Sequence, residues 1–355
     1  MPLSIGIVGL PNVGKSTLFN VLTKSKAEAA NYPFCTIDPN VGVVKVPDER
    51  LAKIAAVSHP AKIIPTAIDF VDIAGLVKGA HEGEGLGNKF LANIRECDAI
   101  CEVVRNFEDG NIIHVAGKID PESDRETIGL ELIFADMQTV GKRLDKTMKT
   151  VRSGDKETSK QKEILEKIKT FLEEGHPVRE MEANSEQEEK EIIKSFQLLT
   201  SKPIIYVLNI NEHSASLASE WQNETVRMNI KIEEEIANLP EDERAEYVKE
   251  LGLEESGTDK LIKASYKLLG LITFFTTGTD ETRAWTCQQG DTAPMAAGKI
   301  HTDFEKGFIR AEVIDWKKFI ETGGEQVARE KGLLRIEGKS YFVQDGDICN
   351  FLVNK

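Results

Sequence analysis

SIGIVGLPNVGKSTLFN, residues 4–20, is the stretch of sequence that decides the fold. Its apolar residues 5–8 predict a buried strand, and GLPNVGKS, residues 9–16, has the spacing G-x-x-x-x-G-K-S of a phosphate-binding P-loop. The residues that follow can begin a helix, so strand, turn and helix come in the order that this loop requires. The alternative to a P-loop is a tight turn that matches this motif by chance. The stretch predicts a nucleotide-binding α/β domain.

The chemistry of the loop follows from its residue types. Its glycines let the backbone curl until successive N–H groups point at phosphate oxygens, beside the positive end of the helix dipole. Lys15 supplies a positive charge to the β- and γ-phosphates, and the Ser16 hydroxyl can ligate Mg²⁺. The predicted phosphate-binding set is Gly9, Asn12, Val13, Gly14, Lys15, Ser16 and Thr17.

Composition narrows the class of protein. The chain has 355 residues, of which 40% are hydrophobic, so it can build the cores of two or three domains. Its formal net charge of −14 argues against broad nucleic-acid binding by charge and leaves room only for a local RNA contact. The five cysteines are scattered without zinc spacing, which predicts reduced thiols. With no stretch near the about 20 apolar residues of a membrane span, we expect a cytoplasmic protein.

Two segments after the P-loop are expected to complete the magnesium and phosphate site. Thr36 lies in a polar, proline-bounded loop, where we expect it to fold in as a second Mg²⁺ ligand, although an ordinary loop threonine is the alternative. The apolar run 68–73 predicts a strand that ends at Asp72, whose carboxylate can hold the metal through water. The Gly75 amide can bond the γ-phosphate. The glycine-rich residues 79–87 are expected to form a mobile switch hinge.

The residue that positions the attacking water is not obvious. Leu76 stands where Ras-like enzymes have a water-orienting glutamine, and it offers neither a donor nor an acceptor. His114 is a candidate because a neutral imidazole can orient water or accept its proton. A lone histidine is more often structural, so both interpretations stay open. The predicted catalytic set is Lys15, Asp72, Gly75 and His114.

The remaining strands predict an open, mostly parallel sheet with its ligand at the carboxyl ends of the strands. A helix is expected near residues 51–58. The expected strands, besides residues 5–8 and 68–73, are residues 41–46, 99–104, 203–208 and 225–230.

An insertion of different composition separates the strands at 99–104 and 203–208. From residue 128 its apolar positions recur in alternating steps of three and four through Leu130, Ile133, Met137, Val140 and Leu144. A turn at 153–155 and a second apolar series at 164–172 predict two long antiparallel helices that form a coiled coil. Its abundant Lys and Glu are typical of a solvated face, and a protruding arm could also dock a partner.

From about residue 276 the sequence predicts a small α+β unit with turns at 323–324 and 345–346. It has no evident catalytic cluster, so a binding role is favoured. Strands are expected at 308–314 and 340–343, and short helices at 316–319 and 324–331. The predicted domains are a discontinuous nucleotide-binding domain, residues 1–127 and 201–275, the helical insertion, residues 128–200, and the C-terminal domain, residues 276–355.

These motifs together resemble the YchF/Obg-like ATPase family of P-loop proteins over essentially the whole chain. The likeness implies a G-domain-like nucleotide domain and a C-terminal β-grasp domain of the TGS type. Most relatives in the wider class have N-K-x-D, whose aspartate binds guanine. Residues 209–212, NINE, look like the N-x-x-E form of the branch that prefers ATP.

Physical chemistry supports an adenine site independently. Loss of a charged acceptor costs about 1.5–3 kcal/mol, and the longer glutamate displaces the carboxylate from guanine. The Asn209 amide can bond adenine, with Ile210 beside the base and backbone groups near Asn229 completing the pocket. Phe107 could stack on the base, but core packing is equally compatible with it. The loop at 227–230 lacks the Ser-Ala usual in relatives.

The resemblance also implies a reaction and a partner. It places this chain among the hydrolases in which a hydrophobic residue, here Leu76, replaces the catalytic glutamine. It matches His114 to a mobile-loop histidine proposed to act in hydrolysis. It also matches Asn12 to an asparagine that coordinates K⁺ in some related enzymes. It implies Mg²⁺-dependent hydrolysis of ATP by a ribosome-associated protein with a role in translation or stress response. The rivals are a GTPase of the same fold and a nucleotide-gated ribosome- or RNA-binding scaffold in which hydrolysis is incidental.

Overall fold

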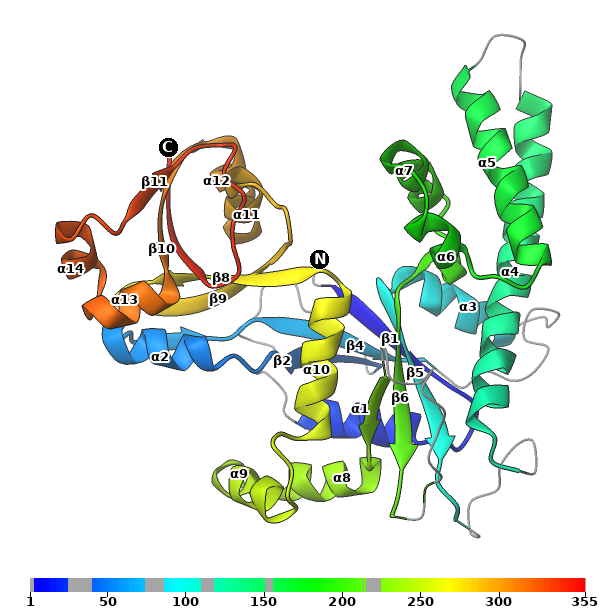
Figure 1. The fold of residues 1–355 in the computed structure, drawn as a ribbon, viewed down its shortest axis with the longest axis horizontal. Coiled ribbons are helices and arrows are strands. Elements are labelled where there is room, and N and C mark those ends of the chain that lie inside the picture. The colour runs from blue at the N-terminus through cyan, green and yellow to red at the C-terminus, as the bar shows by residue number, and fades with distance from the viewer. Residues whose placement is uncertain are drawn as a thin grey trace.

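The computed structural model describes residues 3–24, 40–73, 86–109, 118–150, 156–212, 214 and 225–354. Two six-stranded sheets organise these residues, and a helical arm projects from the first sheet (Figure 1). The C-terminal lobe and the arm stand on opposite sides of a notch. In the described part of the chain, no helix is both long enough and apolar enough to cross a membrane.

The first sheet carries the P-loop. Its strand order is β2-β4-β1-β5-β6-β7, and all neighbouring pairs are parallel except β2 with β4. This confirms the open, mostly parallel sheet. The strands are β1 (Ser4–Val8), β2 (Val41–Lys45), β4 (Ala67–Asp72), β5 (Ala99–Asn106), β6 (Ile204–Ile210) and β7 (Thr225–Met228).

Burial explains why these sequences form central strands. All eight residues of β5 are buried, and four of the five in β1 are, because helices cover both faces of the sheet. Figure 1 places α1, α8 and α10 on one side and α3 with the lower part of α4 on the other. The helices that belong to this domain are α1 (Lys15–Lys24), α3 (Leu86–Glu96), α8 (Ile230–Asn238), α9 (Glu241–Glu250) and α10 (Gly257–Leu268).

The insertion forms the predicted pair of long antiparallel helices, α4 (Pro121–Thr150) and α5 (Lys156–Glu173). Ile133 and Val140 of α4 pack with Ile164 and Ile168 of α5 in the core of the arm. Leu130 was expected in this seam, but 47% of its surface is exposed, because α4 still lies against the first sheet at that level rather than against α5. The arm continues into α6 (Val178–Ala183), α7 (Gln187–Ser195) and a 3₁₀ turn, η2 (Leu199–Ser201).

A buried carboxylate anchors the arm to the sheet. Asp136 of α4 is fully buried and accepts hydrogen bonds from the Leu199 and Thr200 backbone N–H groups, at 2.9 and 2.7 Å, and from the Thr200 hydroxyl at 2.7 Å. Both backbone donors belong to η2, just before β6. The three bonds satisfy a charge whose burial would otherwise be costly.

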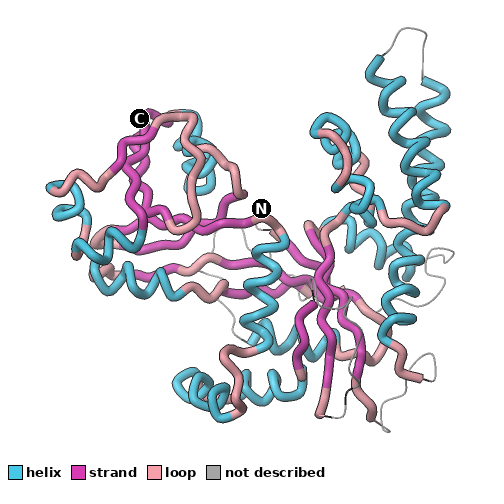
Figure 2. Tube along the Cα trace, in the orientation of Figure 1, coloured by secondary structure: helices cyan, strands magenta, loops and turns pink. Residues whose placement is uncertain are grey.

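The second sheet builds the C-terminal lobe, whose strands are magenta in Figure 2. Its strand order is β11-β10-β12-β8-β9-β3. Its strands are β3 (Lys62–Ile64), β8 (Leu271–Thr277), β9 (Glu281–Gln288), β10 (Phe308–Asp315), β11 (Arg335–Glu337) and β12 (Asp347–Val353). Its helices are α2 (Glu49–Ser58), α11 (Ala293–Ile300), α12 (Thr302–Lys306), α13 (Trp316–Thr322) and α14 (Glu325–Glu330). The helices predicted at 316–319 and 324–331 are confirmed as α13 and α14.

The strand predicted at residues 340–343 is wrong. These residues form a turn, with only an isolated bridge from Phe342 to Thr292, and the strand is β12 instead. Asp347 explains the turn, because its carboxylate accepts hydrogen bonds from the Gln344 N–H at 2.9 Å and the Tyr341 hydroxyl at 2.6 Å. These bonds fold the chain back before β12 begins.

The chain between β2 and β4 leaves the first sheet and joins the second. Helix α2 buries Leu51 and Ile54 against Phe275 and Phe319 of the C-terminal core. Strand β3 pairs in parallel with β9 at the edge of the second sheet. A segment from the middle of the nucleotide-binding half is therefore part of the C-terminal core, and it ties the two lobes together.

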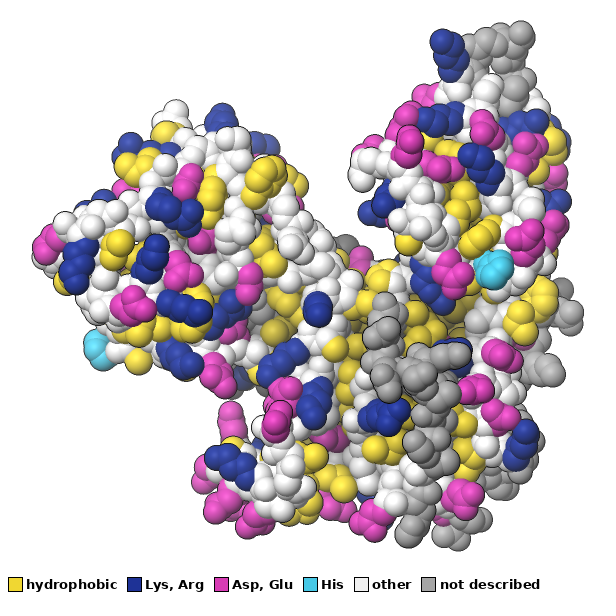
Figure 3. Space-filling model, viewed as in Figure 1, with side chains coloured by type: hydrophobic (Ala, Val, Ile, Leu, Met, Phe, Trp, Pro, Cys, Tyr) yellow, Lys and Arg dark blue, Asp and Glu magenta, His cyan; other side chains and the backbone are white. Residues whose placement is uncertain are grey.

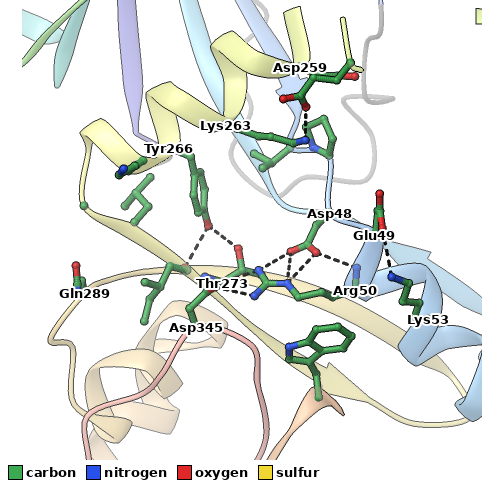
Figure 4. Close-up of a pocket in the computed structure, with 18 residues that line it drawn as sticks. Asp48, Glu49, Arg50, Lys53, Asp259, Lys263, Tyr266, Thr273, Gln289 and Asp345 are labelled. Carbon is green, nitrogen blue, oxygen red and sulfur yellow. Dashed lines mark hydrogen bonds and ion pairs between the residues drawn. The ribbon is translucent and has the colours of Figure 1, made fainter. Parts of the chain in front are cut away.

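An ion-pair network fixes this crossing. The Arg50 guanidinium of α2 bonds the Asp48 carboxylate, at 2.8 Å, and the Asp345 carboxylate, at 2.7 Å, and lies 5.4 Å from the Phe275 ring centre (Figure 4). Asp345 in turn accepts the Thr273 N–H of β8 at 3.0 Å. Beside this network opens a pocket of about 710 Å³, which is lined from both lobes and includes none of the P-loop residues.

Replacement of Arg50 by methionine is expected to destabilise the C-terminal lobe. The change leaves two carboxylates without their shared cation, at a cost of about 1.5–3 kcal/mol. Thermal unfolding followed by tryptophan fluorescence measures it, because Trp285 and Trp316 both pack in this lobe. Lys53→Met is the matched control, since its exposed pair with Glu49 should contribute less than about 1 kcal/mol. Equal melting temperatures for Arg50→Met and the wild type would contradict the network.

A second buried carboxyl lies where the arm meets the sheet. Glu102 of β5 is 1% exposed, and its Oε1 has no hydrogen-bond partner among the described residues. Burial raises the pKa of Glu102 to about 8, against the lowering effect of Arg179 and Arg125. The carboxyl is therefore mostly protonated at neutral pH.

This raised pKa predicts a pH dependence of stability. Between the ordinary carboxyl pKa and about 8, folded Glu102 keeps a proton that the unfolded chain releases, so stability falls as pH rises, by up to about 1.4 kcal/mol per pH unit. Glu102→Gln removes this group, so its stability relative to the wild type should grow from pH 5 to pH 8. Unfolding midpoints at several pH values measure it, with the exposed Glu126→Gln as control. A pH-independent difference would refute the assignment.

Candidate functional site

The P-loop packs too closely against neighbouring strands to accept larger residues at its glycines. Gly9 has φ 151° and Gly14 has φ 107°, both in the region that favours glycine. A Cβ on Gly9 would lie 2.5 Å from the Val103 carbonyl oxygen, and one on Gly14 would lie 2.8 Å from Asn209 Nδ2. Helix α1 begins directly after, with Leu18 N–H bonded to the Gly14 carbonyl at 2.9 Å. The loop thus has the strand, turn and helix that the sequence predicted.

Lys15 lies at the centre of this turn. It is 8% exposed, and its Nζ donates to the Leu10 carbonyl at 2.7 Å, so the amine is held within the curl of the loop. Burial lowers the pKa of Lys15, and the charge of Asp72 opposes that effect. Asp72 ends β4, where its Cα is in register with Ile7 of β1. A buried cation and a carboxylate thus meet at the carboxyl ends of adjacent strands.

The other P-loop residues occupy the rim of the turn. Ser16 and Thr17 lie in the first turn of α1, where Ser16 is exposed and Thr17 is half-buried. Asn12 is exposed and has φ 64°, and Val13 is buried beneath the loop. The Ser16 side chain at the helix N-terminus is therefore accessible to a ligand, as an anion site requires.

Asn209 of β6, which is separated from β1 by β5, holds the P-loop in place. Its side chain is 6% exposed, its Nδ2 donates to the Val13 carbonyl at 3.0 Å, and its Oδ1 accepts the Ile230 N–H at 3.2 Å. One amide therefore joins the P-loop to the start of α8. The expected contact of the Asn209 amide with adenine is distinct from these two bonds within the protein, and it stays a prediction.

Asn229 shows that the predicted strand at 225–230 is wrong at its end. Strand β7 stops at Met228, and the Asn229 Oδ1 accepts the N–H groups of Lys231 and Ile232, at 3.1 and 3.3 Å, as the N-cap of α8. Ile230 is then the first helical residue. The apolar pattern alone could not separate a strand end from a capped helix start.

The segment after β5 lies beside Asn209. Phe107 is half-buried, and the Arg105 guanidinium lies 4.5 Å from its ring centre. Ile210 ends β6, half-buried and in register with Asn106. The structure thus brings Phe107, Asn209 and Ile210 to the same edge of the sheet. Arg105 was not among the predicted site residues, and its only signal in the sequence is an arginine at the end of a mostly apolar strand.

Several predicted site residues lie outside the described residues. These are Thr36, Gly75, Leu76 and His114. Their roles stay predictions. In the parts of the chain that the structure does describe, no three His, Cys, Asp or Glu side chains gather as a metal cage.

Family models and known proteins agree with this geometry. A model described as "50S ribosome-binding GTPase" matches residues 4–131, and one for the YchF-GTPase C-terminal region, described as a "protein of unknown function (DUF933)", matches residues 271–354. The "Ribosome-binding ATPase YchF" of Bacillus subtilis is 53% identical and that of Escherichia coli O157:H7 is 50% identical, each over the full length of both chains.

A solved structure extends the likeness to three dimensions. The "Schizosaccharomyces pombe YchF GTPase" superposes with a TM-score of 0.87 at 39% identity, over 99% of this chain and 97% of that one. Sequence identity and fold therefore agree from the P-loop to the C-terminal lobe. The chain belongs to the YchF family.

Proposed function

We propose that this chain is an Mg²⁺-dependent ATPase that cleaves the β–γ bond by direct attack of water and works on the ribosome. The observation that carries the proposal is the buried Lys15 amine, held inside the curl of the P-loop with Asp72 beside it. The amine, the inward-turned backbone and the α1 dipole together suit a triphosphate. Relatives named ribosome-binding ATPases are similar over the whole chain.

The donor set suits Mg²⁺. Ser16 offers an exposed hydroxyl at the start of α1, and Asp72 offers a carboxylate at the end of β4, which are the hard oxygen ligands that this ion prefers. We assign Ser16 and Thr36 as direct ligands and Asp72 as a ligand through water. When bound, the ion would neutralise charge that develops on the phosphate oxygens. Lys15 would stabilise the same charge with its amine, and we assign the Gly75 amide to the γ-phosphate.

The base is assigned as adenine. Asn209, Ile210, Phe107 and the backbone at Asn229 lie at or beside the edge of the sheet where the P-loop ends, and Glu212 is exposed. A glutamate in place of the aspartate of N-K-x-D removes the acceptor that guanine requires. The names of the relatives differ on this point, since some say ATPase and one says GTPase. The nucleotide is therefore the first property to measure.

We assign the positioning of water to His114, because Leu76 has no polar atom for it. We also propose that Asn12 holds K⁺ against the developing charge, consistent with its exposed, left-handed position at the rim of the loop. Neither role involves a covalent intermediate with the chain. We propose that turnover is slow without a partner. It should be faster in potassium than in sodium, because K⁺ held by Asn12 would face the developing negative charge.

The ribosome is the proposed partner, and a local RNA contact could form part of that interface. We propose that the C-terminal lobe is a TGS-like β-grasp domain. The helical arm and this lobe stand apart across the notch, so each could contact the ribosome separately (Figure 3). Acidic and basic side chains are interspersed over the arm, which suits a local contact rather than broad charge-driven binding. We propose residues 1–127 with 201–275, 128–200 and 276–355 as the three domains, with the exception that residues 49–64 and 271–275 of the first pack with the C-terminal domain. We also propose that the protein is cytoplasmic.

Calorimetric titration with ATP and with GTP, each with Mg²⁺, tests the base assignment. We expect tighter binding of ATP by about tenfold or more, because Glu212 displaces the carboxylate with which an aspartate would bond guanine. Lys15→Ala is the control and should weaken both nucleotides together, since the phosphates are common to them. Tighter binding of GTP would overturn the assignment.

Phosphate release by His114→Ala, with and without ribosomes, tests the catalytic assignment. Loss of a group that orients water or moves its proton should lower kcat by about 10²-fold or more with little change in nucleotide affinity. His176→Ala is the matched control, because His176 is an exposed histidine on the arm. Unchanged turnover of His114→Ala in both conditions would show that the histidine has no role.

A further inference from the structure

Three consecutive backbone carbonyls beside the proposed base site are held by side chains. Arg105 donates from Nε to the Phe107 carbonyl at 3.0 Å and from Nη2 to the Asp109 carbonyl at 3.4 Å. The carbonyl between them, that of Glu108, accepts from Asn211 Nδ2 at 3.3 Å. A loop at a strand end normally turns its carbonyls to water, so this arrangement fixes a segment that would otherwise be free to move.

Arg105 is unusual in its own right. It is 1% exposed, and burial of a guanidinium is costly unless its donors are satisfied. Its donors form a rigid planar fork, so bonds to two carbonyls fix the distance between them. The same plane lies 4.5 Å from the centre of the Phe107 ring. One side chain thus sets both the backbone of residues 107–109 and the position of the ring.

Asn211 is itself preset for its contact. Its backbone N–H donates to the Ser214 Oγ at 2.7 Å, and the Ser214 hydroxyl lies 3.1 Å from the Asn211 Oδ1. These contacts turn the amide nitrogen toward Glu108. Asn211 belongs to the NINE segment, so the two loops that flank the proposed base site are tied to each other.

Arg105 lies on β5, the strand against which the P-loop packs. Arg105 is in register with Asn209, and the preceding Val103 carbonyl is the group that a Cβ on Gly9 would meet at 2.5 Å. Phe107 is half-buried, so its ring is not enclosed by the protein. The segment that Arg105 holds is therefore next to the strand end where the base is assigned.

We propose that Arg105 and Asn211 are positioning residues for the purine, which hold residues 107–109 so that the Phe107 ring is preset to stack on the base. The proposal rests on the proposed function, because it needs the base at this edge of the sheet. Neither residue belongs to the P-loop, since Arg105 lies in β5 and Asn211 follows β6. A preset ring spares the nucleotide the cost of ordering the loop, so the two residues act on affinity for the base alone.

The test compares ATP with inorganic tripolyphosphate, which keeps the phosphates and lacks the base. Titrations with Mg²⁺ on Arg105→Met should show ATP weakened by about tenfold or more, within the range measured for one stacked base, and tripolyphosphate unchanged within about twofold. Arg105→Lys should not restore ATP affinity, because an ammonium cannot reproduce the fork. In hydrolysis assays KM should rise while kcat stays the same.

Arg283→Met is the matched control, because its guanidinium lies 4.2 Å from the Trp285 ring centre in the C-terminal lobe. It should leave both ligands unchanged. If Arg105→Met fails to fold, Asn211→Ala serves in its place and should weaken ATP alone by about threefold, since it frees one carbonyl of the three.

Two results would overturn the proposal. One is an equal loss of ATP and tripolyphosphate affinity, which would make Arg105 a support of the P-loop. The other is an unchanged ATP affinity in folded Arg105→Met or Asn211→Ala. A wild-type chain that binds ATP no more tightly than tripolyphosphate would instead overturn the base pocket of the proposed function, together with this inference.

Discussion

The close approach of the P-loop to the strands beneath it is the constraint on which the site depends. Gly9 lies against the Val103 carbonyl of β5, and Gly14 lies against the Asn209 amide of β6, with no room for a Cβ at either position. Because the loop is fixed between two central strands, Lys15 is buried in a set position beside Asp72. The P-loop part of the site is therefore built before any nucleotide arrives, and binding does not have to order it.

The same first sheet is tied mechanically to the C-terminal lobe. The chain leaves β2, forms α2 and β3 within the other core, and returns as β4, which ends at Asp72. Arg50 fixes this crossing through carboxylates on both sides of it. A displacement of β4 relative to the second sheet would have to strain this network. The two lobes are thus expected to move as one body near the metal-side edge of the site, while the arm is anchored separately through Asp136.

The features that were predicted correctly from the sequence each depend on residues close together in the chain. The P-loop spacing places Lys15 and Ser16, and the steps of three and four predict α4 and α5, because each pattern lies within one stretch of chain. Pairings between distant segments were not predictable in this way. Nothing in residues 62–64 indicates that β3 pairs with β9, and the strand pattern of β5 does not show which carbonyls Arg105 bonds. The apolar pattern predicted that the strand continues through Asn229. The hydrogen bonds of its side chain show instead that Asn229 caps the next helix.

Under the proposed base assignment, the buried Arg105 guanidinium holds the backbone beside the base rather than bonding the purine itself. In N-K-x-D proteins a carboxylate bonds guanine directly, whereas Glu212 here is exposed and the buried cation, Arg105, bonds the chain itself. A pocket that selects by shape and stacking discriminates by about 10- to 200-fold, far less than one whose buried polar groups must be paired by the ligand. The choice of purine in this chain is therefore expected to depend on how rigidly residues 107–109 and Asn209 are held. Under the proposed function, the rigidity of residues 107–109 adds to the hydrogen bonds that the Asn209 amide offers to adenine.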